Sequence, residues 1–278
     1  MNRILIVLVA CGLFAVPAHA MADRTFVSGK GTDSGTCAYA SPCRSFAFAL
    51  SQTATGGEID VLDPGGFGAV TITKAISIVN DGVGTAGIMA SSGNAITIAS
   101  IRGNGTVRLR GLTIEGLGTG ANGILFNTGS NLEIENCVIR AFNKAAINIA
   151  PTQTQPVTGL LRNVIASGGL IGISVASGSS TSVNVTVVDS VASGYNGFGI
   201  EALSAFTQVM VRNSVVSNSA TGLFPMSGAI IRVGHSVVTG NAVGVNADAG
   251  GTLFNYGDND IDGNVNNNTG VLTPLAMH

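Results

Sequence analysis

The sequence feature that most constrains the fold is a repeat that begins near residue 106. One turn pattern recurs six times, at successive offsets of 25, 27, 26, 24 and 22 residues. A small residue followed by an aliphatic one comes nine to twelve residues after each turn, so every repeat is recognised twice. Self-similarity at a period of this length is typical of solenoids. The repeated turns are Arg110-Gly111-Leu112, Glu135-Asn136-Cys137, Arg162-Asn163-Val164, Val188-Asp189-Ser190, Arg212-Asn213-Ser214 and Gly234-His235-Ser236.

Within each repeat, apolar and polar residues alternate, as in Leu132-Glu133-Ile134-Glu135. This period of two predicts short strands. Helical repeats are disfavoured because the i, i+3, i+4 apolar spacing is missing and the chain has 39 glycines. Three short strands per repeat would stack as parallel sheets at roughly 4.8 Å per coil. The sequence therefore predicts an all-β fold, a single-stranded parallel β-helix (solenoid).

The core of this solenoid is predicted to consist of aliphatic ladders. Hydrophobic residues make up 45% of the chain, aromatic residues only 5%, and Trp is absent. Small β-branched side chains must therefore fill the interior. The aligned positions of the first ladder are Leu109, Ile134, Leu161, Val187, Val211 and Val233, and those of the second are Ile124, Ile147, Ile173, Ile200, Leu223 and Val245.

The polar residue at the first turn also recurs, as Asn136, Asn163, Asp189 and Asn213. Asn and Asp tolerate a left-handed backbone and can hydrogen-bond along a stack. These positions predict an asparagine ladder. His235 follows in the next coil, which favours a turn residue over a catalytic base. By the same alignment Cys137 faces the core, as a buried and unreactive thiol.

The first 20 residues have the pattern of a signal peptide. Arg3 precedes an apolar run over residues 4–14, and Pro17-Ala18-His19-Ala20 ends in a small-residue cleavage site. A membrane anchor is the alternative, but the run is shorter than a spanning helix needs. A secreted or periplasmic protein without a membrane span is expected. The net charge of −2 argues against general affinity for nucleic acid.

Residues 22–75 are predicted to form an N-terminal cap and the first coil, since a solenoid exposes its ends. In an oxidising compartment, Cys37 and Cys43 are expected to form a disulfide across a short loop. Residues 45–50 predict a short capping helix with Ser45 near its start and Phe46 and Leu50 on one face. The β-helix is expected over residues 76–265, followed by a C-terminal tail over 266–278.

Five segments of the N-terminal part of the chain form a characteristic set, namely Thr25-Phe26-Val27-Ser28, Ser41-Pro42-Cys43-Arg44-Ser45-Phe46, Gly56-Gly57-Glu58-Ile59, Leu62-Asp63-Pro64-Gly65-Gly66-Phe67-Gly68 and Ile72-Thr73-Lys74-Ala75-Ile76-Ser77-Ile78. This arrangement resembles secreted bacterial β-helix repeat proteins of the pectin-lyase-like superfamily. The resemblance spans nearly the whole mature chain. It implies a right-handed helix and a superfamily rich in polysaccharide lyases and glycosidases. It does not imply activity, because function belongs to sites rather than folds.

The catalytic motifs of that superfamily are missing from the sequence. The Asn-Thr-Asp, Asp-Asp, Gly-His-Gly and Arg-Ile-Lys motifs of polygalacturonase-like hydrolases do not occur, and Gly234-His235-Ser236 departs from the third. A pectate-lyase-like enzyme of the same superfamily needs clustered carboxylates that bind calcium. Instead, Glu133 lies one coil after Arg108, and Glu135 lies between Arg110 and Arg162, which predicts charge pairs between neighbouring rungs.

Two function classes remain. The first is an extracellular scaffold or glycan-binding module without catalytic activity, and the second is a polysaccharide lyase or glycoside hydrolase acting on an acidic, uronate-type polysaccharide. Arg162 and Arg212 occupy equivalent positions two coils, or roughly 9.6 Å, apart, where they can meet two carboxylates of a polysaccharide or cell-surface glycan. The alternative for both is a solvated surface arginine. The missing motifs favour the first class.

A calcium loop is the one metal motif in the sequence. Asp258-Asn259-Asp260-Ile261-Asp262-Gly263 matches the D-x-D-x-D-G opening of such a loop. Thr269 stands where the last ligand, usually Glu, is expected. Asp258, Asp260 and Asp262 can equally be outward residues of a strand or turn in the last rung.

Overall fold

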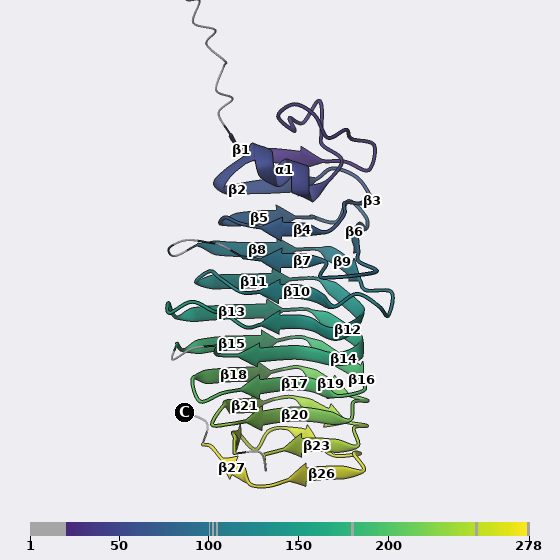
Figure 1. Cartoon of the computed structure of the whole chain (residues 1–278). Coiled ribbons are helices and arrows are strands. Elements are labelled where there is room, and N and C mark those ends of the chain that lie inside the picture. Colours follow the sequence, from purple (N-terminus) through teal and green to yellow (C-terminus); the bar gives the residue numbers. More distant parts are fainter. Residues whose placement is uncertain are drawn as a thin grey trace, which may run out of the picture.

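Each circuit of the chain adds one rung to a stack of parallel strands, which runs from β1 at one end to β26 and β27 at the other (Figure 1). The computed structural model describes residues 21–99, 101, 103, 105–178, 181–247 and 250–276. The expected signal peptide, residues 1–20, lies outside the described residues. Among these residues, every pairing between named strands is parallel, as the parallel β-helix prediction requires.

One sheet, sheet A, follows a single order along the axis. Its strands are β1 (Ala22–Val27), β2 (Thr53–Val61), β5 (Ile76–Val79), β8 (Thr106–Arg110), β11 (Asn131–Glu135), β13 (Val157–Arg162), β15 (Val183–Val188), β18 (Thr207–Arg212), β21 (Ile230–Gly234), β24 (Thr252–Asn255) and β27 (Leu272–Pro274).

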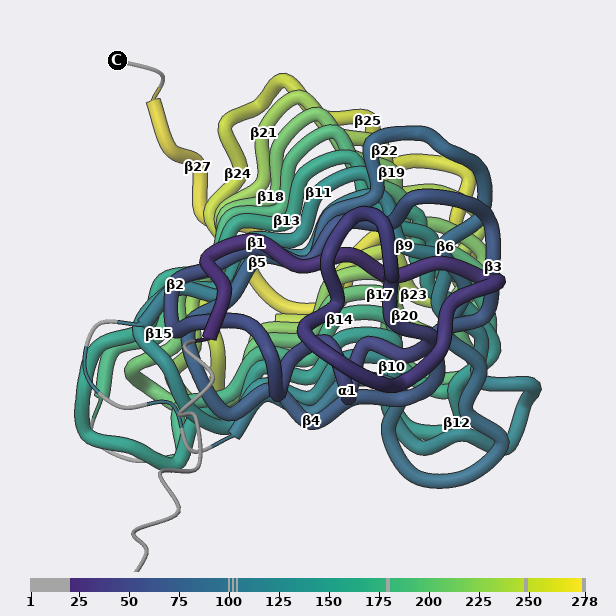
Figure 2. The backbone as a smooth tube through the Cα atoms, turned by 90° about the horizontal axis from the view of Figure 1, so that it is seen from above, coloured from purple at the N-terminus to yellow at the C-terminus, as the bar shows by residue number. Residues whose placement is uncertain are grey.

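The second sheet, sheet B, has two stacks that are joined where the long strands β12 (Val138–Ile149) and β14 (Ile165–Ala176) belong to both. Stack B1 contains β3 (Gly65–Gly66), β6 (Ala86–Met89), β9 (Leu112–Glu115), the first parts of β12 and β14, β16 (Val191–Tyr195), β19 (Val215–Ser217), β22 (Val237–Thr239) and β25 (Asp260–Ile261). Stack B2 contains β4 (Val70–Ile72), β7 (Ile96–Ile98), β10 (Asn122–Phe126), the last parts of β12 and β14, β17 (Phe198–Leu203), β20 (Thr221–Met226), β23 (Val243–Asn246) and β26 (Asn266–Thr269). Viewed along the axis, sheet A and the two stacks enclose the core (Figure 2).

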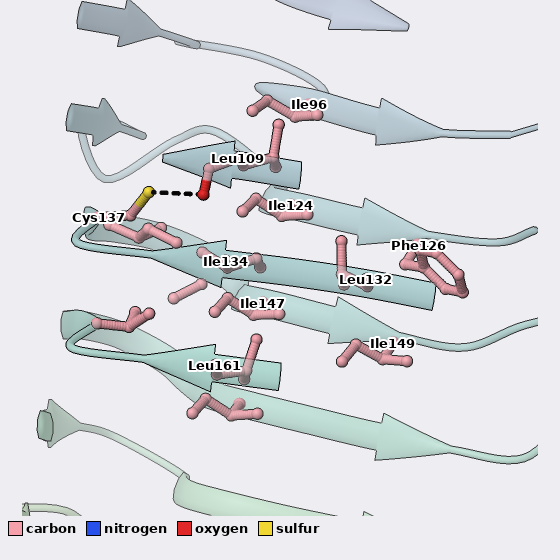
Figure 3. Close-up of a cluster of buried hydrophobic side chains, with 14 of the residues drawn as sticks. Ile96, Leu109, Ile124, Phe126, Leu132, Ile134, Cys137, Ile147, Ile149 and Leu161 are labelled. Atoms are coloured by element: carbon pink, nitrogen blue, oxygen red, sulfur yellow. Dashed lines mark hydrogen bonds between the residues drawn. The ribbon is translucent and has the colours of Figure 1, made fainter. Parts of the chain in front are cut away.

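The aliphatic ladders lie where the repeat predicts them. Leu109, Ile134 and Leu161 are directly paired across β8, β11 and β13, and all three are fully buried. The second ladder is equally in register, as Ile124 and Ile147 show (Figure 3). Burial of apolar side chains at each rung is the main stabilising contribution, about 25 cal/mol per Å².

The asparagine turns adopt the predicted left-handed backbone. Asn136, Asn163, Asp189 and Asn213 have φ between +46° and +54°. Asn163 donates a side-chain hydrogen bond to Asn136 at 2.8 Å, and Asn213 donates one to Asp189 at 2.6 Å. The side chains thus bond in two pairs.

Cys137 is the buried thiol that the alignment predicts. Its side chain is 1% exposed, and its sulfur lies 3.7 Å from the Leu109 carbonyl (Figure 3). Burial raises the pKa of the thiol to about 11. Because the thiolate is the nucleophile, this cysteine is unreactive at neutral pH.

The N-terminal end is closed as the sequence predicts. Helix α1 (Phe46–Gln52) buries Phe46, Ala49 and Leu50, and the Ser45 hydroxyl accepts a hydrogen bond from the Phe48 N–H at 3.2 Å. A side-chain oxygen at this position satisfies one of the free N–H groups of the first turn. Cys37 and Cys43 form the expected disulfide, and β1 pairs with β2, so the cap continues sheet A.

The C-terminal boundary differs from the expectation. Residues 266–269 form β26, which pairs with β23, and residues 272–274 form β27, which pairs with β24. The solenoid therefore extends beyond residue 265 into the segment expected to be a tail. The run of Asn residues in β26 hid this strand, because Asn is depleted in strands and favours turns.

Candidate functional site

The outer face of sheet A is charged in its N-terminal half, and its charges neutralise one another. Arg24 pairs with Glu58 at 3.2 Å and with Asp60, and Arg108 pairs with Glu133 at 2.5 Å. Glu58, Arg108 and Glu133 line a small hollow of about 100 Å³. Such exposed pairs contribute little stability, but these arginines are already neutralised and offer little to an acidic ligand.

The predicted charge pairs between rungs are confirmed in part. Arg108 and Glu133 pair as expected, and Arg162 lies 3.6 Å from Glu135. Arg110, although it is directly opposite Glu135 in the register, pairs with Asp81 instead. Asp81 lies just beyond β5, so the alignment of strand residues could not reveal it.

Arg162 and Arg212 stand in one column, two rungs apart, because both align with Val188. Their electrostatic surroundings differ. Arg162 is bound to Glu135, whereas Arg212, in the described part of the chain, has no carboxylate within ion-pair distance. The column is therefore as predicted, but the two arginines are not equivalent as anion-binding groups.

Arg212 borders a cradle above Gly234, the residue next to it in the following rung. A Cβ atom on Gly234 would lie 3.1 Å from Tyr256 Cδ2, 3.3 Å from Arg212 Nη1 and 3.5 Å from Asp258 Oδ1. A guanidinium, an aromatic ring and a carboxylate thus pack over Gly234, which is buried beneath them. We call this group, with Arg232 and His235, the Arg212 site.

Arg232 adds a second cation to this site. It lies on β21 on the same face as Gly234, with Nη1 donating to Gln208 Oε1 at 2.8 Å. Its guanidinium lies 5.5 Å from the centroid of the Phe254 ring. Contacts with an amide oxygen and a ring leave its charge available to an anion, while they hold its orientation.

His235 adopts the turn conformation that the sequence predicts, with φ of +51°. Its N–H donates to Asp258 Oδ1 at 2.9 Å, and its Nδ1 lies 3.9 Å from Asp258 Oδ2. The imidazole is 68% exposed, so it borders solvent beside the cradle. The repeat alignment identified the turn residue, but the neighbouring Asp258 comes from the next rung.

The three aspartates of the calcium motif do not converge. Asp258 is bound to His235, whereas Asp260 is exposed on β25 opposite Val237. Asp262 accepts hydrogen bonds from the Gly263 N–H at 2.7 Å and from Asn267 Nδ2 at 3.1 Å. These bonds, the Gly263 one first, lower the pKa of Asp262. Among the residues that the structure describes, no group of three His, Cys, Asp or Glu side chains is placed to hold a metal.

We therefore expect calcium to leave the melting temperature of the protein unchanged. An ion that binds the folded state at a hundredfold excess over its dissociation constant would add about 2.7 kcal/mol. Thermal melts with calcium and with chelator measure this directly. A calcium-dependent rise that disappears in Asp260→Ala would contradict the expectation and restore the predicted metal site.

The sequence patterns did not single out one further functional candidate. Glu201 on β17 is 5% exposed, and its Oε1 accepts a hydrogen bond from the Ser174 hydroxyl at 2.6 Å. Phe224 follows it in the next rung and stacks on Phe198, with ring centroids 4.4 Å apart. Burial raises the pKa of Glu201. Glu201 is charged, whereas Ser174 and Phe224, its partners in the neighbouring rungs, are uncharged. This contrast was the sequence signal that could have identified Glu201.

Comparison with known proteins now places the chain in a family. The family model for a right-handed β-helix region matches residues 94–269, which is more than half of the chain. The chain belongs to this family, and the right-handed helix that the resemblance implied is confirmed. In the described part of the chain, no helix is long and apolar enough to cross a membrane.

Two solved structures resemble the chain to different degrees. The pectate lyase Pel9A matches with a TM-score of 0.64 and 16% sequence identity, over 88% of this chain and 72% of that chain. The A-module of the mannuronan C-5 epimerase AlgE4 from Azotobacter vinelandii matches with a TM-score of 0.38 and 12% identity, over 92% and 90% of the two chains. A search of curated proteins finds none that matches. The first likeness shows a pectin-lyase-like fold and, at this identity, nothing of the chemistry.

Proposed function

We propose that this protein is a glycan-binding module without catalytic activity, and that the Arg212 site binds an acidic sugar of a polysaccharide or cell-surface glycan. The observation that carries the proposal is the guanidinium of Arg212 beside the Gly234 cradle, which has no carboxylate of the described residues within ion-pair distance. Guanidinium groups bind carboxylates in a planar, bidentate geometry. Tyr256 supplies an amphipathic ring next to it, against which a sugar ring can pack.

An extracellular location fits the same proposal. The disulfide between Cys37 and Cys43 forms and persists in an oxidising compartment. The N-terminal signal pattern points the same way. We infer a secreted or periplasmic protein, as in the bacterial proteins that the sequence resembles.

A uronate-acting lyase or hydrolase is the second candidate, and one observation favours it. The Arg212 site brings an imidazole, a carboxylate and a guanidinium together, with His235 Nδ1 3.9 Å from Asp258 Oδ2. Removal of a proton next to a carboxyl group needs a base together with cations that neutralise the acid. The four hydrolase motifs are missing, however, which is why binding is the primary proposal.

The test is calorimetric titration with tetragalacturonate, an oligouronate. We expect Arg212→Ala to weaken binding roughly tenfold or more, because a hydrogen-bonded charge pair contributes about 1.5–3 kcal/mol. Arg162→Ala is the matched control: it removes the same side chain from the same column, but one that Glu135 already neutralises. Its effect should be much smaller.

Two outcomes would overturn the binding proposal. Equal losses in the two variants, or no binding by the parent protein, would remove the Arg212 site as the anion-binding group. Turnover of polygalacturonate would be detected as the ultraviolet absorbance of unsaturated products or as new reducing ends. It would show that the protein is a uronate-acting lyase or hydrolase rather than a binding module. Such turnover should then be lost in His235→Ala.

A further inference from the structure

The outer face of stack B1 carries two regular columns of side chains. We call it the valine–serine face. Its first column is apolar, with Val138, Ile165, Val191, Val215 and Val237 directly paired from rung to rung. Its second column is made of hydroxyl groups, with Ser167, Ser193, Ser217 and Thr239 in register beside the first.

The apolar column lies at the surface rather than in the core. Ile165 is 45% exposed and the four valines of the column are half-buried, whereas Ala166, Val216 and Val238 at the neighbouring positions are buried. Successive strand residues point to opposite faces of a sheet, so Ile165 faces outward and Ala166 faces the core. Arg140 stands in the second column in the rung of Val138, but neither column contains a charged residue in the four rungs from Ile165 to Val237.

A hollow of about 440 Å³ continues the apolar column toward the N-terminal end. Gly66 and Gly87 occupy the same column in the preceding rungs, followed by Thr113. Without side chains there, the backbone forms a flat floor. Met89, 64% exposed, borders the hollow, and it is followed in the same column by Glu115 and Arg140, which form an ion pair.

This face matches the chemistry of a neutral polysaccharide. A sugar ring presents C–H groups on its faces and hydroxyl groups at its edge, which correspond to the apolar column and the hydroxyl column. Ligand sites typically combine an apolar surface with a few polar groups, and the hollow falls in the usual range of about 300–1,000 Å³. An acidic polymer would gain little here, because Glu115 neutralises Arg140, the cation that borders the hollow.

An aliphatic residue beside a hydroxyl residue recurs in the four rungs from Ile165 to Val237, which suits a partner that is itself a linear repeat. A second copy of this chain is the alternative, because it carries the same columns. The face measures roughly 24 Å by 10 Å from strand spacing and rise, or about 250 Å². A stable protein interface buries about 800 Å² on each partner, so a second copy would gain too little.

We propose that the valine–serine face binds an extended, neutral polysaccharide along the helix axis, with one sugar ring in the hollow over Gly66 and Gly87. This site lies on a different sheet from the Arg212 site and does not depend on the proposed function. The protein would thereby engage two chemically different glycans on two faces.

The experiment is a titration with cellohexaose and with xylohexaose, followed by nuclear magnetic resonance of protein labelled at methionine and isoleucine methyl groups. The Met89 and Ile165 methyl signals, assigned with Met89→Leu and Ile165→Val, are expected to shift and saturate with at least one hexamer. Gly66→Val should weaken binding roughly tenfold by filling the hollow. A Cβ on Gly66 has no atom within 4 Å, so this variant retains the fold.

Ile165→Lys, at an exposed position, should weaken the same binding by placing a solvated charge in the apolar column. Arg212→Ala is the control and should leave hexamer binding unchanged. Tetragalacturonate titrated into the same samples tests the Arg212 site separately, so the failure of one proposal is distinguishable from failure of the other.

Three results would overturn the proposal. The first is the absence of a shift at both methyl groups with both hexamers. The second is hexamer binding that neither Gly66→Val nor Ile165→Lys weakens. The third is a concentration-dependent dimer that Ile165→Lys abolishes in sedimentation, which would identify a second copy of the chain as the occupant of the face.

Discussion

Replacing Gly169 with alanine is expected to lower the free energy of unfolding by about 4 kcal/mol, which for a chain of this size lowers the melting temperature by about 10 °C. Gly169 has φ of +121°, and a Cβ atom there would lie 2.0 Å from the Phe142 carbonyl oxygen. Phe142 and Tyr195 occupy the same column on either side of Gly169. The Phe142 carbonyl belongs to a paired strand and the Phe142 ring is buried, so this residue cannot move away from a new Cβ atom. The strain therefore stays in the folded state.

Gly168 offers a matched control for this prediction. It is the preceding residue and also has positive φ, +68°, but a Cβ atom there would meet nothing within 4 Å. Gly168→Ala should cost only about 1 kcal/mol, the usual penalty for alanine in a left-handed backbone. Thermal melts followed by circular dichroism compare the two. Equal melting temperatures would show that the close approach to Phe142 does not constrain the chain at Gly169.

Glu201→Gln is expected to stabilise the protein at neutral pH by about 1–2 kcal/mol and to have little effect near pH 4, because an ionised carboxylate is far more costly to bury than a neutral acid or amide. Burial raises the pKa of Glu201 in the folded state, and the bond from Ser174 opposes this shift only in part. A raised pKa means that the folded state binds the proton more tightly than the unfolded state, where Glu titrates near 4.3. The stabilisation is therefore fully present below about pH 4.3 and is lost as the pH rises through the folded pKa.

Glutamine keeps an oxygen that accepts the Ser174 hydrogen bond and cannot ionise. The variant should therefore be more stable than the parent only above about pH 4.3. Urea unfolding of the parent and the variant between about pH 4 and pH 8 measures the difference. Asp260→Asn removes an exposed carboxylate, and as the control it should not stabilise the protein at neutral pH. A constant difference between parent and Glu201→Gln across the pH range would contradict a buried, titrating carboxyl group.

The repeat by itself determined most of the fold. A period of 22 to 27 residues with alternating apolar residues is compatible with few architectures other than stacked short strands. Rung spacing then follows from backbone hydrogen bonding, and the register follows from the need to bury one face of each strand. Leu109 and Ile134 align in the repeat for this reason, and they pair in the structure. The left-handed turns at Asn136 and Asn163 follow from local backbone preference.

The sequence also placed Arg162 and Arg212 in one column, since a column is a property of the repeat. Their different surroundings depend on side-chain conformations and on which carboxylates lie in reach. Arg162 has Glu135 in the preceding rung, whereas the residue opposite Arg212 in the preceding rung is Val188. The alignment of the repeats therefore predicts that Arg162, but not Arg212, has a carboxylate in the preceding rung. The alignment does not predict the pairing of Arg110 with Asp81, because Asp81 lies outside the strands.

Only the tertiary structure decided what stands over Gly234 and what lies against Glu201. Tyr256 and Asp258 reach the Gly234 cradle from the following rung through a turn whose path the repeat does not specify. Glu201 reads as an ordinary outward residue, because strand alternation assigns it to the outer face. Its burial comes from how its neighbours pack on that face, which depends on three-dimensional contacts between rungs. Periodicity determined the positions of the backbone. Side-chain packing between rungs determined which charged groups are paired and how exposed the residues of the candidate sites are.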